Sequence, residues 1–163
     1  MDKNIIILER RLFSALGHER TQINAINQLI GNDKASVISC EDINSNEMPF
    51  KNKIISQLPK LNLKEEGKEP KSYIQESGKK LIKIFKDNKL NKINKIIIPS
   101  ARKLEISLIT YLYKINKFPQ SITPVIRILD IVFIENLPKT TLELFFYLVN
   151  KGKIHLFTET KEL

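Results

Sequence analysis

Two hydrophobic patterns alternate along the chain. Short runs of consecutive apolar residues predict strands that are buried on both faces, whereas apolar residues recurring every three or four positions predict amphipathic helices. The first pattern predicts strands at residues 4–8, 35–40, 95–99, 123–131 and 153–158, with a weaker candidate at 52–58. The second pattern predicts helices at residues 19–30, 72–88, 101–115 and 138–149.

The apolar stripes also predict which side chains of these helices face the core. In the helix at 19–30, Ile23, Ile26 and Ile30 share one stripe, and Gly31 directly after them is typical of a helix end. In the helix at 138–149, the residues predicted to face inward are Leu142, Phe145, Phe146 and Val149.

Strands that alternate with helices predict an α/β fold: a doubly wound, mainly parallel sheet with helices on both faces. The 163 residues are enough for one such domain, so we expect a single Rossmann-like domain over residues 1–163. The chain finishes "FTETKEL", where a further helix starts after the last strand. We therefore expect the domain to be one part of a larger assembly.

Composition places the chain among soluble globular proteins. Its residues are 42% hydrophobic and 28% charged, and no apolar run approaches the ~20 residues needed to cross a bilayer. The N-terminus lacks the small-residue cleavage site of a secretory signal. Because Cys40 is the single cysteine, an internal disulfide is excluded, and we expect a cytoplasmic protein.

The net charge of +9 comes mainly from lysine, with 22 Lys against 5 Arg. Lysine, asparagine and isoleucine are used heavily together, as in "KDNKLNKINKIII", which indicates a compositional bias as readily as a binding surface. Arginine and aromatic residues are not clustered, which disfavours nucleic acid as a partner. A contiguous lysine stripe with exposed aromatics would favour it. A basic face also suits anionic membranes at the inner membrane surface, or phosphorylated substrates.

The loop after the first predicted strand, "FSALGHE", is the first candidate site. In an open α/β sheet, ligands bind at the carboxyl ends of the strands, where this loop lies. Gly17 allows a positive φ or a close approach of the backbone, and the helix after it offers free N–H groups. His18 is placed to donate, accept or shuttle a proton; alternatively the two residues only form the turn and help to cap the helix.

Other predicted strand ends add candidates at the same edge. Ser100 and Arg102 follow one strand, Arg127 lies inside another, and Glu159 follows the last. Each of these residues also has a plain structural explanation as a solvated loop or helix-start residue. This explanation is weakest for Arg127, because a charge within an apolar strand needs a partner. The chain lacks the G-x-G-x-x-G, P-loop and G-x-S-x-G motifs, and its two histidines and one cysteine have no metal-site spacing.

Four stretches together resemble the N-terminal half of a GT-B fold glycosyltransferase, especially the group-1 (GT4-like) enzymes. They are "IIILERRLFSALGHERTQINAINQL", "KIIIPSARKLEISLITYLYKI", "TPVIRILDI" and "IHLFTETKEL", and they cover nearly the whole chain. The resemblance implies an acceptor-side domain that works with a separate donor-binding domain. Such enzymes move a sugar from a nucleotide-sugar donor to a glycan, lipid-linked or small-molecule acceptor, usually without a metal.

The resemblance also implies roles for the candidate residues. Gly17 and His18 would line the acceptor side near the donor phosphates, and the residues around the acceptor would be Ser100, Arg102, Arg127 and Glu159. Many members carry a histidine after the strand matching "PVIRILDI", where this chain has Arg127, Leu129 and Asp130. We expect the domain alone to bind weakly and catalyse little. The alternative is a non-catalytic α/β module that binds nucleic acid or protein through a basic surface.

Overall fold

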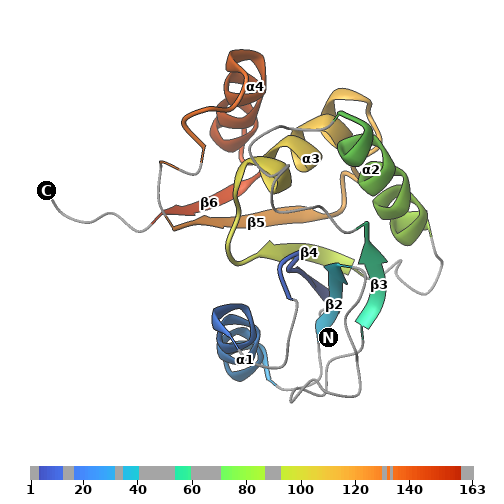
Figure 1. Cartoon of the computed structure of the whole chain (residues 1–163), viewed down its shortest axis with the longest axis vertical. Helices are drawn as coiled ribbons and strands as arrows, with labels where there is room; N and C mark the ends of the chain where they lie inside the picture. Colours follow the sequence, from blue (N-terminus) through green and yellow to red (C-terminus); the bar gives the residue numbers. More distant parts are fainter. Residues whose placement is uncertain are drawn as a thin grey trace, which may run out of the picture.

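The computed structural model describes residues 4–12, 17–31, 35–40, 54–59, 71–86, 93–129, 132 and 134–158. Strands and helices alternate along these residues (Figure 1). In chain order, the elements are β1 (Asn4–Leu8), α1 (His18–Ile30), β2 (Ala35–Cys40), β3 (Ile54–Leu58), α2 (Lys71–Lys86), β4 (Ile93–Ile98), α3 (Lys103–Lys114), β5 (Thr123–Ile128), α4 (Lys139–Asn150) and β6 (His155–Thr158).

Each strand and helix expected from the hydrophobic pattern is present, including the weaker strand candidate, which is β3. The differences lie at the ends of elements: β5 ends at Ile128 instead of residue 131, and α3 begins at Lys103 instead of residue 101. Glycines end helices where expected, since Gly31 after α1 has φ 79° and Gly152 after α4 has φ 65°.

The six strands form one sheet in the order β3-β2-β1-β4-β5-β6, and every neighbouring pair is parallel. This is the strand order of the Rossmann fold, in which the chain builds one half of the sheet outward from β1 and then the other half outward from β4. The predicted doubly wound parallel sheet is confirmed. Its order reverses between β1 and β4, and that is where such sheets open a crevice at their carboxyl ends.

Helices cover the two faces unequally. Helix α1 lies on one face, and α2, α3 and α4 lie on the other (Figure 1). Side chains of β1 alternate between the two layers: Ile5 and Ile7 pack with Ile23 of α1, whereas Ile6 and Leu8 join the larger core under the three helices. Strand β1 is therefore buried on both faces, which explains why it reads as an uninterrupted apolar run.

Helix α4 departs from the inward-facing set expected from its sequence. Phe145 is fully buried, but the neighbouring Phe146 is 41% exposed, so the expectation that both face the core is wrong. Successive residues of a helix point about 100° apart, and only one of two adjacent phenylalanines can occupy the centre of the buried stripe. The two rings contact each other edge to face, with centroids 5.3 Å apart.

This adjacent pair provides a matched test of the core. We expect Phe145→Ala to lower the free energy of unfolding by about 3–5 kcal/mol, because it leaves a cavity between α4 and the sheet. Phe146→Ala removes the same ring and the same edge-to-face contact from an exposed position, and should cost no more than about 1 kcal/mol. Urea unfolding followed by circular dichroism measures both; equal losses would contradict the assigned orientation of α4.

Candidate functional site

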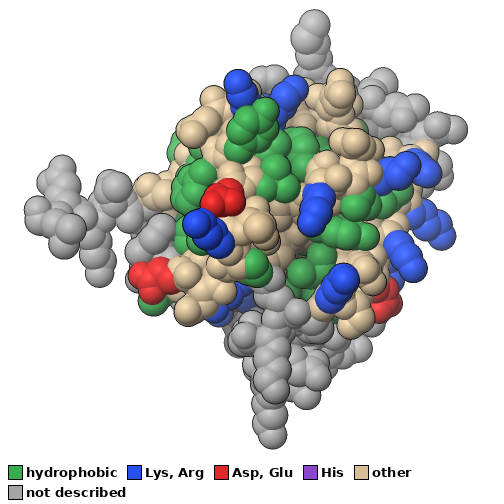
Figure 2. Space-filling model, turned by 90° about the horizontal axis from the view of Figure 1, so that it is seen from above, with side chains coloured by type: hydrophobic (Ala, Val, Ile, Leu, Met, Phe, Trp, Pro, Cys, Tyr) green, Lys and Arg blue, Asp and Glu red, His purple; other side chains and the backbone are tan. Residues whose placement is uncertain are grey.

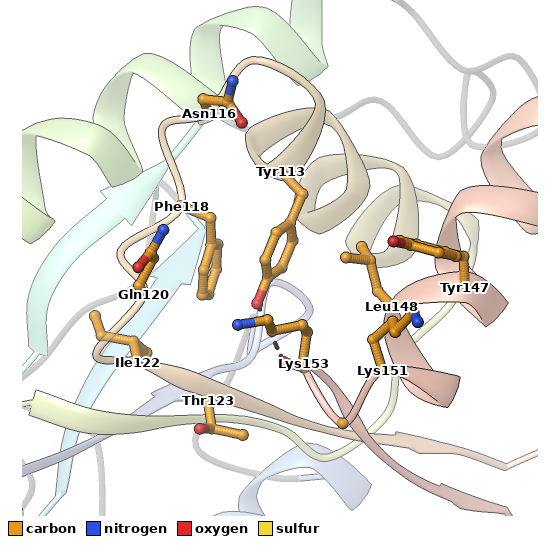
Figure 3. Close-up of a pocket in the computed structure, with 11 residues that line it drawn as sticks. Tyr113, Asn116, Phe118, Gln120, Ile122, Thr123, Tyr147, Leu148, Lys151 and Lys153 are labelled. Carbon is orange, nitrogen blue, oxygen red and sulfur yellow. Dashed lines mark hydrogen bonds between the residues drawn. The ribbon is translucent and has the colours of Figure 1, made fainter.

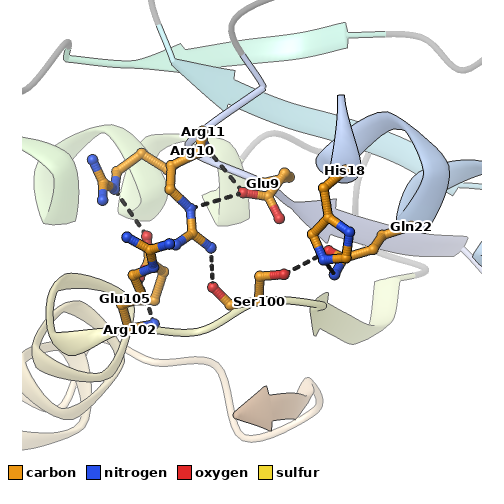
Figure 4. A network of polar contacts seen from close by, with 8 residues as sticks. All are labelled: Glu9, Arg10, Arg11, His18, Gln22, Ser100, Arg102 and Glu105. Carbon is orange, nitrogen blue, oxygen red and sulfur yellow. Dashed lines mark hydrogen bonds and ion pairs between the residues drawn. The ribbon is translucent and has the colours of Figure 1, made fainter. Parts of the chain in front are cut away.

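A cluster of buried charged and polar side chains lies where β1 and β4 end, at the point where the strand order reverses. Residues Glu9, Arg10 and Arg11 follow β1 directly, and Ser100 follows β4 (Figure 4). All four are buried. Since charges away from water must be paired, the partners of these side chains define the cluster.

Arg10 ties the end of β1 to helix α3. Its Nε donates to Oε1 of Glu105 at 2.8 Å, and both side chains are almost completely buried. The other oxygen of Glu105 accepts from the backbone N–H of Arg102 at 2.8 Å, just before α3 begins. One carboxylate therefore holds the arginine and also satisfies a free N–H at the start of the helix.

Arg11 ties the end of β1 to the end of β4. Its Nη2 donates to the backbone carbonyl of Ser100, and its Nε lies 3.6 Å from Oε1 of Glu9. The same Glu9 oxygen accepts from the backbone N–H of Arg11 at 3.1 Å. The second oxygen, Oε2 of Glu9, is buried and has no hydrogen-bond partner among the described residues.

Burial raises the pKa of Glu9 from 4.5 to about 7, because desolvation penalises the carboxylate. The Arg11 guanidinium and the Arg11 N–H favour the charged form and oppose this rise, while the carboxylates of Glu105 and Glu19 add to it. Glu9 is therefore a carboxyl group that changes charge near neutral pH, inside the crevice region of the sheet.

A short hydrogen-bonded chain connects helix α1 to β4. The Ser100 hydroxyl donates to Oε1 of Gln22 at 2.6 Å, and Nε2 of Gln22 lies 2.6 Å from Nε2 of His18 (Figure 4). Because that Gln22 nitrogen is a donor, this contact requires the facing nitrogen of His18 to accept. These hydrogen bonds fix the ring of His18, which is the first residue of α1.

These side chains surround a notch of about 30 Å³ at the molecular surface. Its lining combines the donors Arg11 and Arg102 with two acceptors, the Glu19 carboxylate and the Ser100 hydroxyl oxygen. His18, Ala101 and Leu129 complete the lining. The notch has room for little more than a hydroxyl group or a water molecule, so a ligand bound here would rest mostly outside it.

Four of the six residues proposed from sequence meet at this notch. His18, Ser100 and Arg102 line it. Gly17 precedes His18 as the N-cap of α1 with φ 134°, a conformation that favours glycine.

The other two residues do not line the notch. Arg127 lies near the carboxyl end of β5, and its carbonyl accepts from Ala101 N–H at 2.9 Å, which places it at the same edge of the sheet. Its neighbours Ile126 and Ile128 pack under the three helices, so its side chain points to the α1 face. Glu159 falls outside the described residues.

Sequence reasoning missed Glu9, Arg10, Arg11 and Gln22 as parts of the site. The signal for the first three was present: three charged residues directly follow a buried strand, at a position where a parallel sheet has its crevice. No comparable signal existed for Gln22, because a glutamine on a helix is ordinarily exposed. Only the approach of α1 to β4 makes it a link between His18 and Ser100.

A larger cavity, of about 790 Å³, lies at the opposite edge of the sheet (Figure 3). Tyr113 and Phe118 stack there with centroids 4.6 Å apart, and the Tyr113 hydroxyl donates to the carbonyl of Lys153 at 3.1 Å. Tyr147, Lys151 and Lys153 also line the cavity. It lies at the amino ends of β5 and β6, away from the crevice, and lacks convergent buried polar groups, so we assign the functional site to the notch.

Comparisons with known proteins add no assignment, since no family model, curated protein or solved structure matches the chain. Among the described residues, no group of three or more His, Cys, Asp or Glu side chains is arranged to hold a metal ion.

The buried carboxyl at the end of β1 gives a pH prediction. The folded chain holds the Glu9 proton up to about pH 7, whereas an unfolded chain releases it near 4.5, so the folded state binds more protons between these values. The contribution of this proton to the free energy of unfolding is complete below pH 4.5 and is lost as the pH rises through 7. We expect Glu9→Gln to remove this loss, about 3 kcal/mol of unfolding free energy.

The measurement is urea unfolding at a series of pH values from about 4.5 to 8. The matched control is Glu143→Gln on the exposed side of α4, which should keep the wild-type pH profile. Parallel profiles for the wild type and Glu9→Gln would contradict the protonated state of Glu9.

Proposed function

We propose that this chain is the acceptor-side domain of a glycosyltransferase, which holds the sugar acceptor while a separate domain supplies the nucleotide-sugar donor. The observation that carries the proposal is the mixed set of hydrogen-bonding groups at the notch. Phosphate sites gather donors only, whereas sugar hydroxyls both donate and accept. Here the donor Arg102 stands beside the acceptor Glu19, and the Ser100 hydroxyl, whose proton goes to Gln22, can still accept a hydrogen bond.

The size of the notch also supports this proposal. A space of about 30 Å³ receives one hydroxyl of a larger molecule, and the rest of that molecule stays open to a second domain. Its position at the reversal of strand order matches the general location of ligands in open α/β sheets. The sequence resemblance implies an acceptor site that includes Gly17, His18, Ser100, Arg102, Arg127 and Glu159. Of these residues, His18, Ser100 and Arg102 line the notch.

In the proposed reaction, an acceptor hydroxyl attacks the anomeric carbon of the donor sugar and the bond to the nucleoside diphosphate breaks. The diphosphate leaves and takes up the proton of the acceptor hydroxyl. The residues of this chain bind and orient the acceptor. His18 keeps one orientation because Gln22 holds its Nε2, and Ser100 is fixed by Arg11 at its carbonyl and by Gln22 at its hydroxyl. Preorganised partners of this kind reduce the cost of positioning a reactant.

A sugar titration tests the proposal. The full chain, labelled with nitrogen-15, is titrated with a panel of methyl glycosides and followed by backbone amide NMR. We expect at least one sugar to shift the amides of Gly17, His18, Ser100 and Arg102 with a Kd near millimolar, about −4 kcal/mol, because one wall provides few contacts. His18→Ala combined with Arg102→Ala should abolish the shifts.

Thr140→Ala on α4, far from the notch, is the control variant and should bind like the wild type. The proposal fails if no sugar of the panel shifts these amides, or if the shifts gather at the Tyr113 cavity. A nucleoside diphosphate that binds the notch more tightly than any sugar would contradict its role as the acceptor site and assign it to the phosphates of a nucleotide.

A further inference from the structure

Lysines gather on the face of the molecule formed by α2, α3 and α4. These helices and the turns after α3 and α4 carry Lys71, Lys79, Lys80, Lys83, Lys86, Lys103, Lys114, Lys117, Lys139, Lys151 and Lys153. The exposed acids within these three helices are Glu76 and Glu143. Helix α1, on the other face, has no lysine. Of the lysines in the described residues, Lys95 on β4 is the one that lies outside this face.

Apolar side chains lie between these lysines. Figure 2 views the molecule from the side of the three helices and shows hydrophobic groups surrounded by basic ones. A groove of about 470 Å³ runs between the helices, with Ile74, Ile115 and Leu144 in its lining and Lys71 and Lys114 also bordering it.

The outer side of α4 adds two aromatic rings. Phe146 is 41% exposed and Tyr147 is 56% exposed; Tyr147 lies on the side of the helix opposite the buried Phe145, and Phe146 lies between the two. The ammonium group of Lys151 lies 5.7 Å from the centre of the Tyr147 ring. Aromatic side chains flanked by lysines are typical of surfaces that rest in the interface of a bilayer.

We infer that the α2–α4 face, defined by these lysines together with Phe146 and Tyr147, docks on an anionic membrane surface. The lysines supply the electrostatic attraction to anionic lipids, and the aromatic pair supplies the apolar contact. Lasting attachment to a membrane surface generally needs two such signals. Within the described residues no helix is long and apolar enough to cross a bilayer, so the contact is peripheral.

Two other occupants fit this face less well. Lysines beside exposed aromatic rings are the pattern named above as favouring nucleic acid. However, nucleic acid is bound most strongly by arginine, which α2, α3 and α4 lack, and Lys151 lies over the Tyr147 ring, which leaves Phe146 as the one ring of this pair for stacking. An acidic helix seated in the groove would meet Lys71 and Lys114 but would not reach lysines such as Lys83 on the outer side of α2. A flat anionic surface is open to exposed lysines on all three helices, among them Lys83, Lys114 and Lys139.

The docking face and the notch are separate surfaces. The notch opens at the carboxyl edge of the sheet, whereas the docking face is the outer side of the helix layer (Figures 1 and 2). A membrane-bound molecule therefore keeps its notch accessible. The inference does not rest on the proposed function, and soluble sugars test that function without any membrane.

Vesicle sedimentation tests the electrostatic part of the inference. The full chain is mixed with vesicles of phosphatidylcholine alone, or of phosphatidylcholine with phosphatidylglycerol. We expect binding to the anionic vesicles only, with loss of binding as the salt rises from about 0.1 to 1 M and the Debye length falls to about 3 Å. Lys83→Gln with Lys114→Gln should weaken binding roughly 25-fold, about fivefold for each lysine.

Lys95→Gln is the matched control, because Lys95 is exposed on β4 and lies outside the docking face. It should bind like the wild type. Equal binding to neutral vesicles, an equal loss in the control, or no binding to anionic vesicles would overturn the inference. Tight binding of polyuridylate without binding to the vesicles would also overturn the inference, since that result assigns the lysines to nucleic acid.

A fluorescence experiment tests the orientation. The chain contains no tryptophan, so Tyr147→Trp places a single reporter on the docking face and Leu29→Trp places one on α1, where Leu29 is 86% exposed. We expect anionic vesicles to shift the emission of Tyr147→Trp to the blue and to leave Leu29→Trp unchanged. A shift in Leu29→Trp alone, or in neither variant despite sedimentation, would overturn the assigned face.

Discussion

The salt-bridged turn after β1 holds the two halves of this sheet together at their carboxyl ends. A doubly wound sheet grows outward in both directions from β1 and β4, and nothing in the ladder itself fixes the loops above these two strands. Arg11 reaches across to the carbonyl of Ser100, and Arg10 reaches Glu105 at the base of α3. Removing one partner from a buried ionic cluster costs about 3–5 kcal/mol, so the shape of the notch depends on this cluster remaining complete.

The same cluster leaves two buried side-chain atoms without a hydrogen bond among the described residues, Oε2 of Glu9 and Nε of Arg11. Oε2 of Glu9 has no hydrogen-bond partner among the described residues, and the raised pKa of this carboxyl follows from that burial. Buried polar groups without partners are rare in stable proteins and gather at functional sites. Glu9 therefore lowers the stability of the fold at neutral pH. Its position at the crevice, beside the groups proposed to hold an acceptor, gives a functional reason for this cost.

The two proposed surfaces, the notch at the edge of the sheet and the α2–α4 docking face, differ in the kind of interaction that they offer. At the edge, a few buried side chains are held by one another and offer specific hydrogen bonds, which suits a ligand with defined stereochemistry. On the face, many ammonium groups act together, which suits a surface that is charged but not ordered. Such an arrangement suits the transfer of a sugar to an acceptor held at a membrane, because docking and recognition do not compete for the same residues.

The sequence by itself determined the elements, their order and the class of the sheet. These properties are carried by local patterns, such as the apolar run of β1 or Gly31 after α1, and burial on both faces requires no knowledge of distant residues. It also placed Gly17, His18, Ser100 and Arg102 at one edge, because parallel strands bring their carboxyl ends together.

Only the tertiary structure decided which side chains complete the site and which aromatic residues stay in water. Gln22 became a link between His18 and Ser100 because α1 packs beside β4, and Arg10 found its partner 95 residues away. Phe146 stayed exposed because Phe145 took the position facing the sheet. Each outcome depends on contacts between residues distant in sequence or on the rotation of a helix against its neighbours, and periodicity in one segment does not encode either of these.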